Sequence, residues 1–174
     1  GRFDLLAAGW FWLSDTPEVP GSRSPEAAFP RTLTWARLGC RQSRRELVFA
    51  NTHFDCQPAA IAMNAQVLGH WLDQLGRETP LVLTGDFNAD KRSAAYQLLT
   101  ADDRLQDAYA AAHPADPAAA TFHGFGQAAP PTAIDWILVS PHFRVQDAWI
   151  DRARQGELYP SDHYPLVALI DWQG

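Results

Sequence analysis

Lysine is nearly absent from this sequence, cysteine is rare, and no apolar run is long enough to cross a membrane. The two cysteines, Cys40 and Cys56, are too few for a disulfide framework, and no Cys/His spacing is typical of a zinc site. We interpret both as small buried side chains. A glycine-rich phosphate loop with its lysine and a Gly-x-Ser-x-Gly motif are also missing, which argues against nucleotide kinases and serine hydrolases.

The composition is that of one globular domain, residues 1–174. Hydrophobic residues make up 47% of the chain, and seven Trp and nine Phe provide bulky core material. The formal net charge is −6 and the isoelectric point is about 5.4. This charge argues against a broad electrostatic grip on long nucleic acid, but it leaves open a nuclease that holds a few phosphates through a metal ion.

Strands outnumber helices in the hydrophobic pattern, which predicts sheets with helices packed outside them. The predicted strands are residues 5–13, 32–38, 46–54, 81–83, 134–139, 143–150 and 164–172, the second and third forming a hairpin. Residues 93–99 predict a short helix, and residues 18–30 and 110–120 predict loops. A longer helix between Pro58 and Gly76 is indicated by one apolar face, made of Ile61, Ala65, Leu68, Leu72 and Leu75.

Polar, ionisable residues cluster at the ends of four predicted strands, where loops gather and ligands bind in sheet proteins. The clusters are Asn51-Thr52-His53-Phe54-Asp55, Gly85-Asp86-Phe87-Asn88, Ile134-Asp135-Trp136 and Ser161-Asp162-His163-Tyr164. Asp, Asn and His without cysteine suit Mg²⁺ or Mn²⁺ better than Zn²⁺. Such hard-cation sites usually neutralise a phosphate during attack by water.

Each cluster also has a purely structural interpretation. Asp86 and Asn88 share one face if the strand continues, but Gly-Asp-x-Asn is also common in turns. Asp135 lies in an otherwise apolar strand and needs a partner, for which His163 is a candidate. Asp55 is more simply an N-cap of the following helix.

Two of the remaining histidines are isolated candidates. His53 ends a strand and is either a site residue or a satisfied core histidine. His123 lies in a loop with two glycines and can line a pocket. The pattern by itself does not choose between these roles.

The four clusters occur in the order and rough spacing of the endonuclease/exonuclease/phosphatase superfamily, which this sequence resembles over its whole length. The resemblance implies a mixed α/β (α+β) fold, the four-layer α/β/β/α sandwich of the DNase I-like type, and Mg²⁺-dependent attack of water on a phosphoester. It implies catalytic roles for His53, Asp86, Asn88, Asp135 and His163, with Asp135 orienting His163. Metal ligation falls to Asp162, Asp86 and Asn88, and substrate contact to Asn51 and His123.

The resemblance covers only the later part of the family domain. Family members begin with further strands that carry an early Asn and a metal-binding Glu, and Glu18, in a proline-rich loop, is a poor substitute. The leading hypothesis is therefore a metal-dependent phosphodiesterase, nuclease-like or acting on a small molecule. The alternatives are a non-catalytic remnant that binds phosphate ligands or a partner, and a phosphomonoesterase on sugar or inositol phosphates. Strands left without neighbours also predict self-association through uncovered sheet edges.

Overall fold

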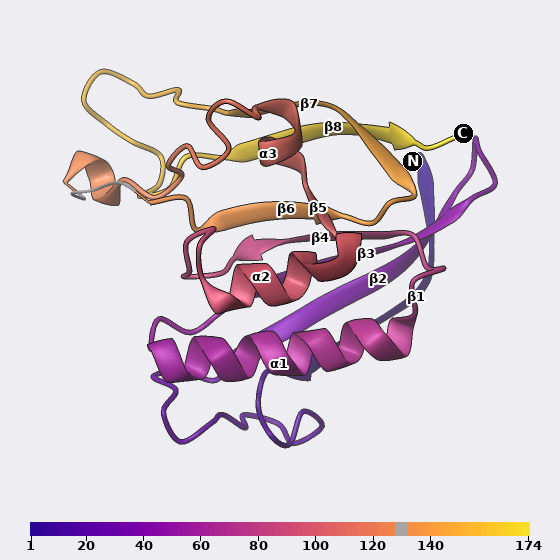
Figure 1. The fold of residues 1–174 in the computed structure, drawn as a ribbon, viewed down its shortest axis with the longest axis horizontal. Helices are drawn as coiled ribbons and strands as arrows, with labels where there is room; N and C mark the ends of the chain where they lie inside the picture. Colours follow the sequence, from indigo (N-terminus) through magenta and orange to yellow (C-terminus); the bar gives the residue numbers. More distant parts are fainter. Residues whose placement is uncertain (128–131) are drawn as a thin grey trace.

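The computed structural model of the chain describes residues 1–127 and 132–174. A six-stranded sheet has the order β1-β2-β3-β4-β6-β5 (Figure 1). Among the described residues of this sheet, β3 and β4 are the one parallel pair; the other pairs are antiparallel. A second, two-stranded sheet is formed by β7 and β8. The strands are β1 (Phe3–Trp12), β2 (Thr32–Cys40), β3 (Glu46–His53), β4 (Leu81–Asp86), β5 (Gln106–Asp107), β6 (Asp135–Val139), β7 (Phe143–Ile150) and β8 (Leu166–Trp172).

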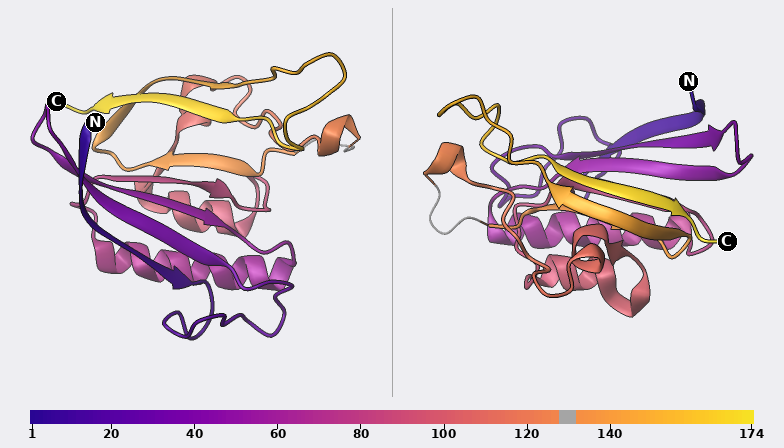
Figure 2. Two further views of the ribbon diagram at one scale, coloured as in Figure 1. Left: turned by 180° about the vertical axis from the view of Figure 1, so that it is seen from behind. Right: turned by 90° about the horizontal axis from the view of Figure 1, so that it is seen from above.

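Helices α1 (Pro58–Leu75) and α2 (Ala94–Thr100) cover one face of the large sheet, and β7–β8 packs on the other (Figures 1 and 2). The five-residue helix α3 (Ala108–Ala112) contacts β6 and β7 across the edge between the sheets. Two single 3₁₀ turns complete the order, η1 (Ala101–Asp103) and η2 (Gly124–Gly126). The predicted mixed α/β class and the packing of sheet on sheet are confirmed, and the described residues supply three layers of the sandwich. No helix in the described ranges is long and apolar enough to span a membrane.

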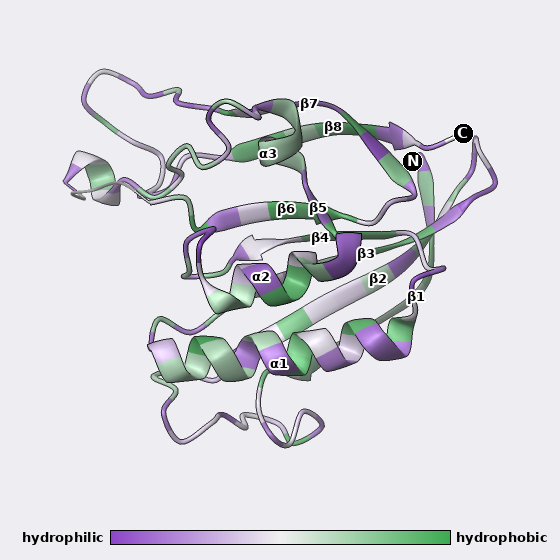
Figure 3. Cartoon of the chain, viewed as in Figure 1, coloured by the Kyte–Doolittle hydropathy of each residue, from purple (hydrophilic) through white to green (hydrophobic). Residues whose placement is uncertain are grey.

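Alternation along the strands explains both core faces. Side chains of a strand point to opposite faces in turn, so Val48 and Ala50 of β3 meet the helices. Leu47 of β3 and Val82 of β4 face β7–β8 instead. Figure 3 shows hydrophobic and hydrophilic residues mixed along α1, and the buried residues Ala65, Leu68 and Leu72 share one face of the helix, as the spacing predicts. The predicted hairpin of residues 32–54 is confirmed as the antiparallel pair β2–β3.

One interpretation of the cysteines is wrong, because Cys40 is buried but Cys56 is exposed. Two expectations about where helices begin are also wrong, and both involve an aspartate. The predicted loop of residues 110–120 begins inside α3, because the side chain of Asp107 accepts a hydrogen bond from the backbone N–H of Ala110 and caps that helix. Asp55 is not the N-cap of α1; Gln57 is. Asp55 is buried and accepts from the backbone N–H groups of Gln57 and Phe29, so it ties the long loop after β1 to the start of α1.

Strand β1 forms one edge of the large sheet and exposes several large apolar side chains. Trp10 is 71% exposed and Leu5 is 67% exposed. An edge strand of this kind offers unpaired backbone groups to another chain. Self-association through such an edge stays a prediction.

Candidate active site

The same alternation that builds the space between the sheets also builds a polar cavity at its end. Along each strand the residues that face β7–β8 change from apolar to polar, and Figure 3 shows this change along β6. The polar residues are Asn51 and His53 on β3, Thr84 and Asp86 on β4, and Asp135 on β6. They line a cavity of about 580 Å³ together with Ser161 and His163. In Figure 1 this is the end marked by the arrowhead of β4, where the connection from β7 to β8 also projects.

The contact between His163 and Asp135 that the sequence suggested is present. The imidazole Nδ1 of His163 lies 2.7 Å from Oδ2 of Asp135. Because a carboxylate accepts the Nδ1 proton, the Nε2 atom of the neutral ring is the one left with a lone pair. The pairing also satisfies a carboxylate that sits between apolar neighbours.

Asp86 lies beside both histidines of the cavity. Its Oδ2 atom is 3.2 Å from Nε2 of His53 and 3.8 Å from Nε2 of His163. The parallel register of β3 and β4, which pairs His53 with Asp86, creates the first of these contacts. Thus two histidines from distant parts of the sequence approach the same carboxylate oxygen of Asp86.

Burial sets the protonation of this group. Burial raises the pKa of Asp86 above that of an ordinary aspartate, and the nearby negative charge of Asp135 raises it further. Burial also lowers the pKa of His53, as do the charges of Arg31 and His163, although Asp86 acts in the opposite direction. Compared with ordinary residues, the raised pKa of Asp86 therefore favours its protonated form and the lowered pKa of His53 favours its neutral form.

The raised pKa of Asp86 predicts the direction in which stability changes with pH. Since the pKa of Asp86 is raised on folding, the folded state binds the proton more tightly, and stability falls as pH rises through that pKa. In EDTA at pH 7 we expect Asp86→Asn to raise the free energy of unfolding on the order of 1 kcal/mol, or about 2–4 °C in Tm. The gain should shrink as the pH falls below the folded pKa. A lower Tm at pH 7 in thermal melts would contradict the assignment.

Gly85 is required by the closeness of β3 and β4. A Cβ atom at this position would lie 2.3 Å from the backbone carbonyl oxygen of Thr52, so an alanine forces the two strands apart. We expect Gly85→Ala to cost about 1–3 kcal/mol of stability and to displace Asp86 from His53. Gly39→Ala is the matched control, because its Cβ would meet only a flexible Leu6 methyl at 3.4 Å. Equal thermal melts for the two variants would refute the argument.

Asn88 does not continue the strand that ends at Asp86. It has a left-handed φ of 48°, and its backbone N–H donates to Oδ1 of Asp86 in a side-chain-closed turn. Its own Nδ2 donates to the carbonyl of Phe54. Asn51 faces the cavity, where its Nδ2 donates to Oγ1 of Thr84 at 2.8 Å. The turn interpretation of this cluster is therefore the one seen, and it orients Asp86.

Asp162 and His123 do not line the cavity. The backbone carbonyl of Asp162 accepts from the N–H groups of His123 and Gly124, and its Oδ1 is 3.3 Å from the hydroxyl of Ser161. His123 is 4% exposed and packs against Tyr164. The expected substrate role of His123 thus finds no open face in the structure.

A group of potential metal-ligand atoms lies within the cavity. Carboxylate oxygens of Asp86 and Asp135 and a nitrogen of His163 all lie within 4.8 Å of one another. Two neighbouring carboxylates, one with a raised pKa, form a site whose charge a divalent cation would relieve. Asp162 is not part of this group, and Glu18 lines a separate groove beside α1.

Arg31 is a residue near the site that the sequence analysis did not single out. Its positive charge acts on His53 and on Asp55, lowering the pKa of both. It directly precedes β2, whose Leu33 pairs with Thr52 at the end of β3. Only the register of this hairpin brings it to the site.

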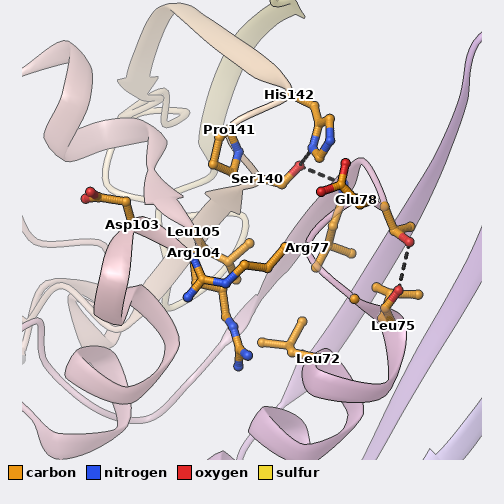
Figure 4. Close-up of a pocket in the computed structure, with 13 residues that line it drawn as sticks. Leu72, Leu75, Arg77, Glu78, Asp103, Arg104, Leu105, Ser140, Pro141 and His142 are labelled. Atoms are coloured by element: carbon orange, nitrogen blue, oxygen red, sulfur yellow. Dashed lines mark hydrogen bonds between the residues drawn. The ribbon is translucent and has the colours of Figure 1, made fainter.

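A second cavity, of about 240 Å³, lies at the other end of β4 (Figure 4). Its walls carry Arg77, Arg104 and His142 above a floor of leucines. Both arginines are already bonded, Arg104 to the carboxylate of Asp73 and Arg77 to the carbonyl of Asp102. It shares no lining residue with the polar cavity, and we assign it no part in the chemistry.

Comparisons with known proteins point in one direction. The sequence model of the Endonuclease/Exonuclease/phosphatase family matches residues 6–163. The structure of the endonuclease/exonuclease/phosphatase from Bacteroides vulgatus is similar, with a TM-score of 0.86, 30% identity, and coverage of 99% of this chain and 67% of that chain. No curated protein matches the sequence.

Two further solved structures are similar in fold. The mannosyl-6-phosphatase Bt3783 of Bacteroides thetaiotaomicron has a TM-score of 0.83 and 30% identity, covering 98% of this chain and 68% of that chain. The human Nocturnin catalytic domain has a TM-score of 0.76 and 23% identity, covering 99% of this chain and 60% of that chain. The chain spans about two thirds of the length of the first relatives it matches.

Proposed function

The chain belongs to the endonuclease/exonuclease/phosphatase family, and on that premise we propose that it hydrolyses a phosphoester, with a phosphodiester as the first candidate. One observation carries the proposal: the Asp135–His163 pair lies beside Asp86 and His53 in one open cavity. A histidine oriented by a carboxylate, next to a second carboxylate, is an arrangement that can move a proton during attack by water.

In the proposed reaction, a water molecule attacks phosphorus, its oxygen forms the new P–O bond, and the bond to the leaving alcohol breaks. Asp86 orients the water and can take its proton. His163, held by Asp135 through Nδ1, directs Nε2 into the cavity: with its lone pair Nε2 can take a proton from the attacking water, and once protonated it stabilises the negative charge of the transition state. His53 contacts the phosphate, and the positive charge of Arg31 acts on His53. The leaving alkoxide takes a proton from solvent to become the alcohol, and the proton removed from the attacking water returns to solvent.

A divalent cation, Mg²⁺ or Mn²⁺, would supply neutralisation of the phosphate charge when bound. The sequence-based ligand set is Asp162, Asp86 and Asn88, and the set whose ligand atoms lie close together is Asp86, Asp135 and His163. Asp86 belongs to both sets, so we propose it as a ligand. Asp135 already accepts a hydrogen bond from His163, so the carboxylate of Asp86 is the more available of the two for a metal ion.

The candidate functions differ in the class of substrate. The net charge of −6 favours a small substrate over duplex DNA, because binding to DNA depends on the release of counterions. A sugar phosphomonoester is the second candidate, favoured by the likeness to a structure named mannosyl-6-phosphatase at 30% identity. A non-catalytic phosphate-binding role is the third hypothesis and is decided by the same assay.

The assay compares bis(p-nitrophenyl) phosphate, p-nitrophenyl phosphate and a hexose 6-phosphate, each with Mg²⁺, Mn²⁺ or EDTA. We expect turnover that depends on the metal and that falls by about 100-fold or more in Asp86→Asn, because Asp86 is the proposed ligand. Asp171→Asn, the same change at an exposed carboxylate on β8, serves as the matched control. No turnover from folded protein with any metal would overturn the catalytic proposal and leave the binding role.

A further inference from the structure

Two loops lie side by side beyond the cavity and are held to each other by backbone hydrogen bonds. They are residues 121–126 and the connection from β7 to β8, and both project at the same end of the molecule (Figures 1 and 2). The N–H groups of His123 and Gly124 donate to the carbonyl of Asp162 at 2.9 and 3.0 Å, and the N–H of Tyr164 donates to the carbonyl of Thr121 at 2.8 Å. The first loop therefore fixes the backbone on both sides of His163.

The ring of His123 is the centre of the contact between these loops. Its centroid lies 4.0 Å from that of Tyr164, nearly parallel, and 4.5 Å from that of Tyr159. The guanidinium groups of Arg152 and Arg154 pack on the outer tyrosine rings, each 5.7 Å from the centroid. Both tyrosines belong to the second loop, so a side chain of the first loop provides the surface against which the second is packed.

A hydrogen bond also fixes this ring from within its own loop. The N–H of Gly126 donates to Nδ1 of His123 at 3.1 Å. Gly126 has a left-handed φ of 82°, and a Cβ there would already touch the Tyr159 ring at 3.4 Å. His123 thus uses its Nδ1 atom as a hydrogen-bond acceptor and its ring face for aromatic packing. Few side chains other than histidine combine these two properties.

We propose that His123 is a positioning residue for the phosphoester site: it holds the loop of residues 121–126 in the shape that fixes the backbone at Asp162 and so places His163 beside Asp86. This rests on the proposed function above. The loop of residues 121–126 contacts His163 and its neighbour directly. The carbonyl of Asp162 accepts two hydrogen bonds from the loop, and the centroid of the Phe122 ring lies 5.0 Å from that of the His163 ring. It replaces the expected substrate contact, since His123 is 4% exposed.

Two variants separate the functions of the ring. His123→Asn keeps an acceptor for Gly126 and loses the aromatic packing, whereas His123→Phe keeps the packing and loses the acceptor. We expect kcat to fall about 100-fold in the first and about tenfold in the second, with KM almost unchanged, because the reacting groups are misplaced and the substrate contacts are kept. His70→Phe on the exposed face of α1 is the matched control and should retain wild-type turnover.

A measurement without turnover keeps this inference separate from the proposed function. The Nδ1 proton of His163, bonded to Asp135, should give a downfield NMR signal that shifts or broadens in both His123 variants and not in His70→Phe. If the wild type has no phosphoesterase activity, this signal still decides whether His123 positions His163. An unchanged signal, a raised KM with unchanged kcat, or a lower Tm with full activity would each overturn the proposal.

Discussion

Replacing His163 by alanine is expected to lower phosphoester turnover by about 10²–10⁴-fold, the range for a group that moves a proton or stabilises charge in the transition state. The fold should survive, because the ring lies at the cavity and not in either hydrophobic core. Circular dichroism and a thermal melt establish folding before kcat and KM are measured. Near-normal turnover in folded protein would remove His163 from the catalytic centre.

A double-mutant cycle that combines changes at Asp135 and His163 tests the role of Asp135. If Asp135 acts by orienting His163, through the 2.7 Å contact, then Asp135→Asn should lower kcat and the double variant should cost little more than the worse single variant. Independent losses that multiply would show that Asp135 acts elsewhere, for example as a metal ligand with Asp86. The cycle therefore also distinguishes between the two candidate ligand sets.

Trp136→Ala is expected to have the largest effect on stability, about 3–5 kcal/mol, because it empties a large space in the core. Trp136 is 1% exposed and stacks on Phe87 at 4.3 Å, with Tyr96 packed edge-on at 5.0 Å. Its indole N–H also donates to the carbonyl of Ala133. A loss of this size is a large part of the roughly 5–15 kcal/mol that stabilises a typical domain.

The control for this prediction is another tryptophan. Trp10 on β1 is 71% exposed, so Trp10→Ala should change stability by no more than about 0.5 kcal/mol. Urea unfolding of both variants gives the comparison. The prediction fails if the two midpoints move by similar amounts, since burial would then not explain the difference. Because Trp136 follows Asp135, loss of activity in the folded fraction is expected as well.

Local sequence patterns predict most of the helices and strands. The face of α1 repeats at helical spacing, and β7 is predicted with the same bounds as in the structure, Phe143–Ile150. The two errors, at Asp55 and Asp107, arise because aspartate can cap a helix from more than one position. A short-range pattern does not show which nearby N–H group the side chain will reach.

The sequence predicts those residues of the candidate site that lie at the ends of strands. An unpaired carboxylate between apolar residues is costly, so the sequence predicts a partner for Asp135, and His163 is that partner. Arg31 was missed because it precedes a strand and has no motif of its own. The burial of His123 was missed because glycines beside a histidine are equally typical of an open pocket.

The sequence by itself determined the chemistry of the strand ends, the class of fold and the family. Tertiary structure decided which of those ends meet: the parallel pairing of β3 with β4 brings His53 to Asp86, and backbone bonds from residues 121–124 fix Asp162 and His163. The physical reason is that alternation and spacing are local properties of a chain. Strand order and register depend on contacts between distant segments, which form only when the sheets and helices pack together.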